Sequence, residues 1–296
     1  MLIHHIINYF SYISPFLPLA LLFLFCIKSK RKILSVKLLF LILTALLSGS
    51  LLFYSRFVEP NTVKINNINI ETGFKSKIIL ISDLHIGAYS SSRFIEKVVN
   101  EINKIQDADF VVIGGDITYY PTKDLEKLLS PLTKIVKQTY VVLGNHDSGR
   151  PGPYINNELT EIFKSGKLKL LKNKAIYIEN LNLNIVGLGD LWAREAEVKK
   201  LDKYLMEDNL LVIAHTPDTV YKYKSNIADL TLSGHTHGGQ IRIPIIYKFF
   251  IPSKYDFDQG LYYTNKGQVY VSSGIGISGL PFRLGIPPAI DIINTY

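Results

Sequence analysis

Residues 77–85 read KIILISDLH, an aliphatic run that ends in an aspartate and a histidine. The same arrangement returns at 110–116 (FVVIGGD), 139–147 (TYVVLGNHD), 210–215 (LLVIAH) and 230–235 (LTLSGH). Short runs that are apolar at almost every position are typical of strands buried on both faces. We therefore expect five buried strands, each of which presents polar residues at its carboxyl end.

The segments between and after these strands predict an α/β fold. Residues 91–105 carry aliphatic side chains at helical spacing, and a second helix is expected at 123–132. Strands that alternate with helices indicate partly parallel pairing, and in such sheets sites form at the carboxyl ends of the strands. After Gly238 the chain becomes rich in Gly, Pro and aromatic residues, with short strands at 268–272 and 289–293 that we expect to close the second half of the sheet.

Every histidine beyond residue 57 falls within or directly after one of these strand-end motifs, and Gly114-Gly115-Asp116 adds a carboxylate. Taken singly, each motif reads as a turn, a helix cap or a core histidine. Five of them in succession are not explained in that way. Imidazole and carboxylate groups together are the ligands of divalent transition metals, so the sequence predicts a metal site.

The first 57 residues predict a membrane anchor of two helices. Residues 1–27 and 38–55 contain no charged residue, and each run approaches the roughly 20 apolar residues that cross a bilayer. A basic loop at 28–37 separates them. A connector is then expected at 58–75, and the catalytic domain at 76–296. The single cysteine, Cys26, excludes a disulfide within the chain.

Charge patterning favours a two-pass protein of the cell (inner) membrane. The formal charge is +8, but residues 1–57 hold six basic residues and no acidic one, which leaves 27 basic against 25 acidic in the remainder. We therefore expect the lipid bilayer as a partner, no nucleic acid, and no obligate protein partner. Basic loops stay cytoplasmic, so the domain is predicted on the extracytoplasmic side.

The first 57 residues have two other interpretations. A hairpin that lies in one leaflet, with Pro15 and Pro18 interrupting the first helix, would leave the domain cytoplasmic. A cleaved signal peptide is disfavoured, because no positive residue precedes the first apolar run and that run is too long.

The order of the motifs, D-x-H, G-D, G-N-H-D, H and G-H-x-H, resembles that of the calcineurin-like metallophosphoesterases over residues 77–240. The tail, with 237–240 (HGGQ), 252–255 (PSKY) and 274–276 (GIG), is similar to the membrane-associated branch of that superfamily. The resemblance implies a four-layer αββα sandwich and a metal-dependent phosphoric ester hydrolase.

The resemblance also implies roles for individual residues and a cofactor of two divalent metal ions. The implied ligands are Asp83, His85 and His237 for the first metal, Asn145, His215 and His235 for the second, and Asp116 as the bridge between them. His146 is the implied catalytic residue beside the phosphate. Nitrogen and oxygen donors without a thiolate suit Mn, Fe or Zn.

One departure from the family pattern concerns the support of His146. Many members carry an acid three residues after the bridging aspartate, where this chain has Tyr119, and Asp147 is the expected replacement. Candidates for phosphate contact are Arg150, Arg242 and Arg283. Four aromatic residues and a short apolar segment are left open between lipid contact and core packing: Trp192, Tyr247, Phe249, Phe250 and 280–282.

The expected function is a phosphodiesterase or pyrophosphatase that acts on a lipid-linked substrate by attack of a metal-bound hydroxide. Tyr119 makes a simple monoester the less favoured substrate. One alternative is a UDP-2,3-diacylglucosamine hydrolase of lipid A synthesis, which needs a cytoplasmic active site. The other is a non-catalytic, metal-bound membrane module.

Overall fold

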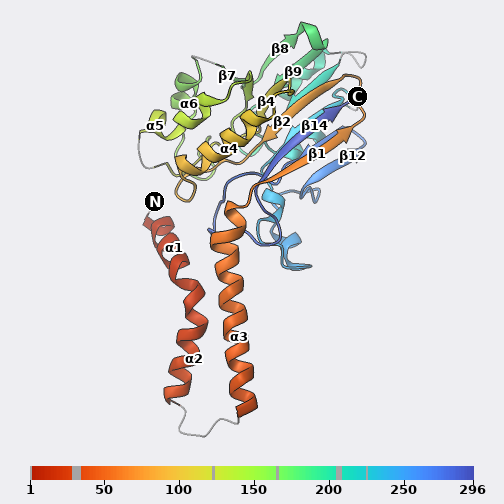
Figure 1. Ribbon diagram of the computed structural model, residues 1–296. Coiled ribbons are helices and arrows are strands. Elements are labelled where there is room, and N and C mark those ends of the chain that lie inside the picture. The colour runs from red at the N-terminus through yellow and green to blue at the C-terminus, as the bar shows by residue number, and fades with distance from the viewer. Residues whose placement is uncertain (1, 29–34, 122–123, 165–166, 205–208, 225) are drawn as a thin grey trace.

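Two six-stranded sheets face each other in the computed structural model, and two long apolar helices extend from one end of this domain (Figure 1). The structure describes residues 2–28, 35–121, 124–164, 167–204, 209–224 and 226–296. The two facing sheets confirm the expected α/β sandwich.

The first sheet has the strand order β1-β14-β2-β4-β6-β7. Its strands are β1 (Lys64–Ile70), β14 (Ala289–Thr295), β2 (Ser76–Ile81), β4 (Phe110–Ile113), β6 (Thr139–Val141) and β7 (Leu168–Leu170). The run from β2 to β7 is parallel, whereas β14 is antiparallel to β2. Strand β1 lies in the segment expected to be a connector. Its side chains are mostly exposed at the sheet edge, so an Asn-rich sequence suffices there and shows no buried-strand pattern.

The second sheet has the order β12-β13-β11-β10-β9-β8. Its strands are β12 (Gly260–Thr264), β13 (Gly267–Val271), β11 (Leu230–Ser233), β10 (Leu210–Ile213), β9 (Leu183–Gly187) and β8 (Lys174–Ile178). The four central strands are parallel and the two edge strands antiparallel. The expectation that the whole C-terminal portion closes one sheet is wrong, because β14 returns to the first sheet.

Alternate residues of the central strands enter different cores, which explains why these strands are apolar at nearly every position. In β2, Ile78 and Leu80 face the second sheet, while Ile79 and Ile81 face the helices. Helices α4 (Ser92–Lys104), α5 (Leu125–Leu129) and α6 (Asn156–Ile162) cover that outer face, followed after α5 by the turn η4 (Ser130–Lys134).

The outer face of the second sheet is covered differently. Among the described residues, its core packs against two short 3-10 turns, η6 (Val198–Lys203) and η7 (Pro217–Lys222). Short elements near the site complete the domain: β3 (Ile86–Gly87), β5 (Thr118–Tyr119), η5 (Glu179–Leu181), η8 (His237–Gly239) and η9 (Ile246–Phe250).

The N-terminal segment forms two helical rods that lie side by side (Figure 1). The first comprises α1 (Leu2–Ile13), η1 (Ser14–Phe16) and α2 (Leu17–Lys28); the second comprises α3 (Ser35–Phe53), η2 (Tyr54–Val58) and η3 (Glu59–Asn61). Both rods are long and apolar enough to cross a bilayer, by length and composition. Residues 29–34 of the expected basic loop lie outside the described residues.

The turn η1 interrupts the first rod at Pro15, as the sequence suggested. A β-carbon at Gly49 would lie 2.7 Å from the carbonyl oxygen of Pro15, so glycine lets the second rod approach the turn closely. Arg56 joins the two rods at their domain end through hydrogen bonds to Ser11 Oγ (2.7 Å) and Asn8 Oδ1 (3.0 Å).

Candidate metal centre

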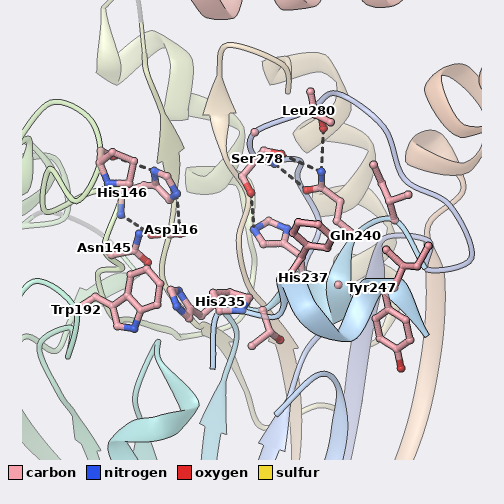
Figure 2. A pocket seen from close by; sticks show the side chains of 18 of the residues that line it. Asp116, Asn145, His146, Trp192, His235, His237, Gln240, Tyr247, Ser278 and Leu280 are labelled. Carbon is pink, nitrogen blue, oxygen red and sulfur yellow. Dashed lines mark hydrogen bonds and ion pairs between the residues drawn. The ribbon is translucent and has the colours of Figure 1, made fainter. Parts of the chain in front are cut away.

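The seven expected metal ligands meet at the carboxyl ends of five strands from both sheets. Strands β2, β4 and β6 supply the first four in chain order, and β10 and β11 supply the three later histidines. All seven are buried: Asp83, His85, Asp116, Asn145, His215, His235 and His237. Figure 2 shows Asp116 and Asn145 on one side of a cavity and His237 on the other, with His235 between them.

The backbone at most of these positions is strained. Asp83, His85, Asp116, His235 and His237 all have positive φ, between 47° and 74°. Non-glycine residues adopt this region at a cost of about 1–3 kcal/mol each, and they persist only where the surrounding structure holds them. The strand ends are held in this way, because the amide of Asp83 donates to the carbonyl of Gly115 and the amide of His85 to that of Asp116.

One ligand group is formed by Asp83, His85 and His237, whose donor atoms lie within 4.8 Å of one another. The Nε2 atoms of the two histidines are 2.9 Å apart, and Asp83 Oδ1 lies 3.5 Å from His237 Nε2. Burial lowers the pKa of His85 to about 3 and holds the pKa of His237 well below its usual value. Both imidazoles are therefore neutral, which is the form that coordinates a cation.

A second group is formed by Asp116, His215 and His235. His215 Nε2 lies 3.2 Å from Asp116 Oδ2 and 3.3 Å from Asn145 Oδ1. His215 Nδ1 donates to the carbonyl of Gly114 at 2.8 Å, which turns Nε2 toward the other ligands. His235 Nε2 is buried and has no hydrogen-bond partner among the described residues.

Asp116 lies between the two groups. Its Oδ2 is 3.6 Å from His85 Nε2 in the first group, compared with 3.2 Å from His215 in the second. Burial alone would raise the pKa of Asp116, but His215, His146 and His85 outweigh burial and hold it well below its usual value. An ionised carboxylate in this position can contact two cations at once.

Two glycines make this close convergence possible. A β-carbon at Gly144 would collide with Asp116 Oδ1, and one at Gly115, where φ is +96°, would lie 2.6 Å from His215 Nδ1. The Gly-Gly-Asp and Gly-Asn-His-Asp motifs therefore need glycine for steric reasons.

These residues fit a pair of divalent cations. The donors are nitrogen and oxygen atoms, and three of the four histidines are kept neutral by burial. A buried imidazole nitrogen of His235 has no hydrogen-bond partner in the part of the chain that the structure describes. Such a donor set, without thiolate, suits Mn, Fe or Zn.

His146 lies at the edge of this centre and is partly exposed to the cavity. Its Nε2 is 4.0 Å from Asp116 Oδ2, and its Nδ1 is 3.0 Å from the carbonyl oxygen of Pro151, which accepts a hydrogen bond from it. The expectation that Asp147 supports His146 is wrong. Both oxygens of Asp147 instead accept backbone amides at the ends of β4 and β6: those of Ile117, Thr118 and Gly144.

Tyr119 packs against His146 without holding it by a hydrogen bond. The two rings are 4.9 Å apart at 66°, and the Tyr119 hydroxyl accepts the amide of Gly279 at 3.1 Å. The support from Pro151 was missed because a backbone carbonyl leaves no residue-type pattern in the sequence.

The three candidate arginines have different environments. Arg283 is fully buried, and its guanidinium donates to the carbonyls of Ser273, Gly274, Gly276 and Ile286, so its assignment to phosphate contact is wrong. Burial lowers its pKa to about 10, so it remains charged at neutral pH.

Arg242 also has protein partners, the carbonyl of Gly238 (2.6 Å) and Asp258 Oδ2 (2.9 Å), and it does not line the cavity. It stabilises the loop that follows His237. Arg150 is exposed, and its carbonyl accepts Asn145 Nδ2 at 2.6 Å. A role for its side chain stays a prediction.

The cavity in front of the ligands has a volume of about 540 Å³, and apolar side chains form much of its lining. We call this part the apolar wall, and it consists of Trp192, Ile241, Ile243, Ile246, Tyr247, Phe250 and Leu280. Trp192 lies edge-on to His235 at 4.5 Å. The residues left open between lipid contact and core packing have different environments. Phe249 is exposed outside the cavity, whereas Pro281 is buried.

Known proteins match this chain over the same region. The family model for calcineurin-like phosphoesterases matches residues 76–239. An uncharacterized metallophosphoesterase, Cj0846 of Campylobacter jejuni, is 32% identical over 90% of this chain and 72% of its own length.

Two relatives are named for an activity. Phosphodiesterase YaeI of Escherichia coli is 32% identical over 74% of this chain and 81% of its own length. UDP-2,3-diacylglucosamine pyrophosphatase LpxG of Chlamydia trachomatis is 24% identical over 68% of this chain and 78% of its own length. With five ligand-bearing strand ends in the matched region, the chain belongs to the calcineurin-like phosphoesterases and is a metal-dependent phosphoric ester hydrolase.

Proposed function

We propose that this protein is a membrane-anchored dimetal phosphoesterase that cleaves a phosphodiester or pyrophosphate bond in a lipid-linked substrate. The observation that carries the proposal is one cavity that is lined both by metal ligands and by the apolar wall. Such a cavity suits a molecule that joins a phosphate to apolar groups. The activities named for YaeI and LpxG support the same class of bond.

In this proposal Asp83, His85 and His237 hold one cation, Asn145, His215 and His235 hold the other, and Asp116 contacts both. When bound, two divalent cations activate water for attack on phosphorus and offset the charge on the phosphoryl oxygens.

The chain's own residues position the substrate and move a proton. Because the carbonyl of Pro151 accepts from His146 Nδ1, the Nε2 atom of His146 is directed at the cavity. As an imidazolium, His146 can donate the Nε2 proton to the leaving oxygen. Trp192 packs edge-on against His235 at the side of the cavity.

We further propose that both rods span the membrane and that the domain is extracytoplasmic. Helix α1 lies beside the domain, so the end of α2 and the start of α3 lie far from it (Figure 1). Lys28 ends α2 and Lys37 lies in the first turn of α3, and basic segments that flank membrane spans stay cytoplasmic. LpxG-like hydrolysis of UDP-2,3-diacylglucosamine remains a second candidate on the strength of that relative alone, and it needs the opposite orientation. Protease added outside intact cells separates the two, because it removes residues 77–296 only if the domain is extracytoplasmic.

The test of the chemistry uses full-length protein in phosphatidylcholine nanodiscs with Mn²⁺. We expect hydrolysis of bis(para-nitrophenyl) phosphate to exceed that of para-nitrophenyl phosphate and to stop on chelation. Asp116→Asn should lower kcat about a thousandfold, because the carboxylate shared by the cations is lost. Asp291→Asn is the matched control, since Asp291 is an equally buried carboxylate bonded to Asn66 and Ser272 in the first sheet.

Full activity of Asp116→Asn contradicts the dimetal mechanism. If the wild type binds Mn²⁺ but turns over neither substrate, the non-catalytic membrane module is favoured instead.

A further inference from the structure

A second apolar cavity lies between the two N-terminal rods and the domain. It has a volume of about 520 Å³, and we call it the anchor groove. The first rod contributes Ile6, Phe10 and Leu21, the second contributes Leu52, and a loop of the domain contributes Leu280 and Phe282. Within the described part of the chain, no charged side chain lines it.

The anchor groove and the metal-site cavity meet at Leu280, which lines both. Gln240, three residues after the ligand His237, donates to the carbonyl of Leu280 at 2.9 Å, as Figure 2 shows. On the other side, the amide of Arg283 donates to the carbonyl of Ser55 at the end of the second rod, at 2.8 Å. The loop that carries Leu280 is therefore fastened to the metal centre and to the anchor at once.

The first rod is also fixed against the rim of the active site. His4 Nδ1 lies 3.2 Å from the hydroxyl of Tyr89, and the His4 ring is 4.2 Å from Tyr120 and 5.2 Å from Tyr119. Tyr119 in turn packs on His146. The groove between the rods thus has a defined position relative to the reacting groups.

We propose that the anchor groove is the route by which an acyl chain of the substrate passes from the bilayer to the metal centre. The chain would lie between the rods, cross Leu280 and place its phosphate at the metals. This rests on the proposed lipid-linked substrate and adds the path that the lipid takes.

The chemistry of the two cavities selects this occupant. One end of the continuous surface is a set of metal ligands that suits a phosphate, and the other end is apolar and opens between helices that are long enough to span a bilayer. A peptide segment would bring backbone polar groups into a groove lined almost entirely by carbon, where they would lack partners. A hydrocarbon chain gains from each buried methylene, so the route predicts a preference for long chains.

The test compares two chromogenic diesters, para-nitrophenyl hexadecyl phosphate and para-nitrophenyl methyl phosphate, with full-length protein in phosphatidylcholine nanodiscs and Mn²⁺. Ile6→Trp should fill the groove and lower the hexadecyl-to-methyl ratio of kcat/KM about tenfold. Ile13→Trp is the matched control. It is the same change in the same helix at equal exposure (57% against 58%), but Ile13 does not line the groove.

A second measurement does not depend on turnover. A hexadecyl methylphosphonate with a photoactivatable chain should label residues 6–21 and the loop around Leu280 in the wild type, with little labelling of Ile6→Trp. An equal ratio in wild type and Ile6→Trp, or an equal fall in Ile6→Trp and Ile13→Trp, overturns the route. If photoactivatable phosphatidylcholine labels the groove and the ratio does not change, the groove holds only bulk lipid. If the wild type cleaves neither diester, the proposed function fails, and labelling still decides whether the groove takes the chain.

Discussion

The two walls of the active-site cavity are built in opposite ways. The metal ligands are buried, come from the ends of strands in both sheets, and include five residues with strained backbone. The apolar wall comes from loops and the short turn η9, and several of its side chains are exposed. Rigid sheet edges thus hold the candidate metal ligands, and loops carry the apolar side chains that line the same cavity.

The same contrast separates what each wall needs from its surroundings. The two sheets hold the strained backbone at the ligands in place, and bound cations would offset the unfavourable energy of burying the carboxylates. Among the described residues of the domain, none covers the exposed apolar side chains of η9 and its neighbours. They lie at the end of the domain from which the rods extend, where a bilayer surface would cover them (Figure 1). Substitutions should therefore have different consequences on the two walls.

The largest effect is expected for a change in a metal ligand, Asp83→Asn. Asp83 contributes a carboxylate oxygen to the first ligand group, and its two oxygens accept the amide of His235 at 3.0 Å. Loss of the charge should lower kcat for bis(para-nitrophenyl) phosphate about a thousandfold, or ~4 kcal/mol of transition-state stabilisation. Steady-state kinetics with saturating Mn²⁺ measures this, with Asp291→Asn as control.

The same variant should be more stable than the wild type when metal is absent. Burial raises the pKa of Asp83 from 3.8 to about 6, so the folded metal-free protein holds a proton that the unfolded chain releases. The Asp83 carboxyl therefore lowers the stability of the wild type as pH rises from 3.8 to 6, and Asp83→Asn lacks that contribution. Above pH 6 the variant should be ahead by roughly 1–3 kcal/mol in chelator, measured by urea unfolding. An advantage that does not change between pH 4 and pH 7 would contradict the raised pKa.

The second prediction separates scaffold from site among the arginines. Arg283→Met removes a buried cation and leaves the carbonyls of Gly276, Ser273 and Ile286 without donors, so the free energy of unfolding should fall by roughly 3 kcal/mol. Arg150→Met is the control, because its side chain is exposed and stability should change by less than about 0.5 kcal/mol. A stable Arg283→Met protein with a raised KM would instead place Arg283 at the substrate.

The metal ligands could be predicted from the sequence because they are rare residue types in a fixed order. Each motif follows a strand that is apolar on both faces. The positions of Asp83, His85 and Asp116 follow from the parallel pairing of β2 and β4. Arg283 was misassigned because the sequence does not show whether a guanidinium faces solvent or four carbonyls. Strand β1 was missed because an exposed edge strand needs no apolar pattern.

Contacts between the first rod and the rim of the site could not be predicted from the sequence. The 3.2 Å approach of His4 to Tyr89 joins residues 85 positions apart, and no local pattern announces it. The support of His146 by Pro151 is carried by a main-chain atom that every residue possesses. The sequence therefore predicted which candidate metal ligands converge, and not which groups orient the side chains around them.

The third prediction tests what His146 does between the two walls. If His146 protonates the leaving oxygen, His146→Gln should lower kcat about a hundredfold for methyl phenyl phosphate, and much less for methyl para-nitrophenyl phosphate, whose leaving group needs little help. His5→Gln is the control, an exposed histidine of α1. Equal losses on both substrates would mean that His146 stabilises charge on the phosphoryl group and does not transfer a proton.

The smallest effect is expected at the apolar wall, where η9 provides a natural pair. Phe249 and Phe250 are adjacent and similarly exposed, at 82% and 76%, but only Phe250 lines the cavity. If the wall binds the apolar part of the substrate directly, Phe250→Ala should raise KM for para-nitrophenyl hexadecyl phosphate about fivefold, because part of a ring's contact area is lost. Phe249→Ala should change it by less than about twofold. If both variants lose affinity for the nanodisc surface and show equal rises in KM, the phenylalanines act together as a membrane contact. In that case the specificity assigned to the apolar wall belongs to its other residues, such as Trp192, Tyr247 and Leu280.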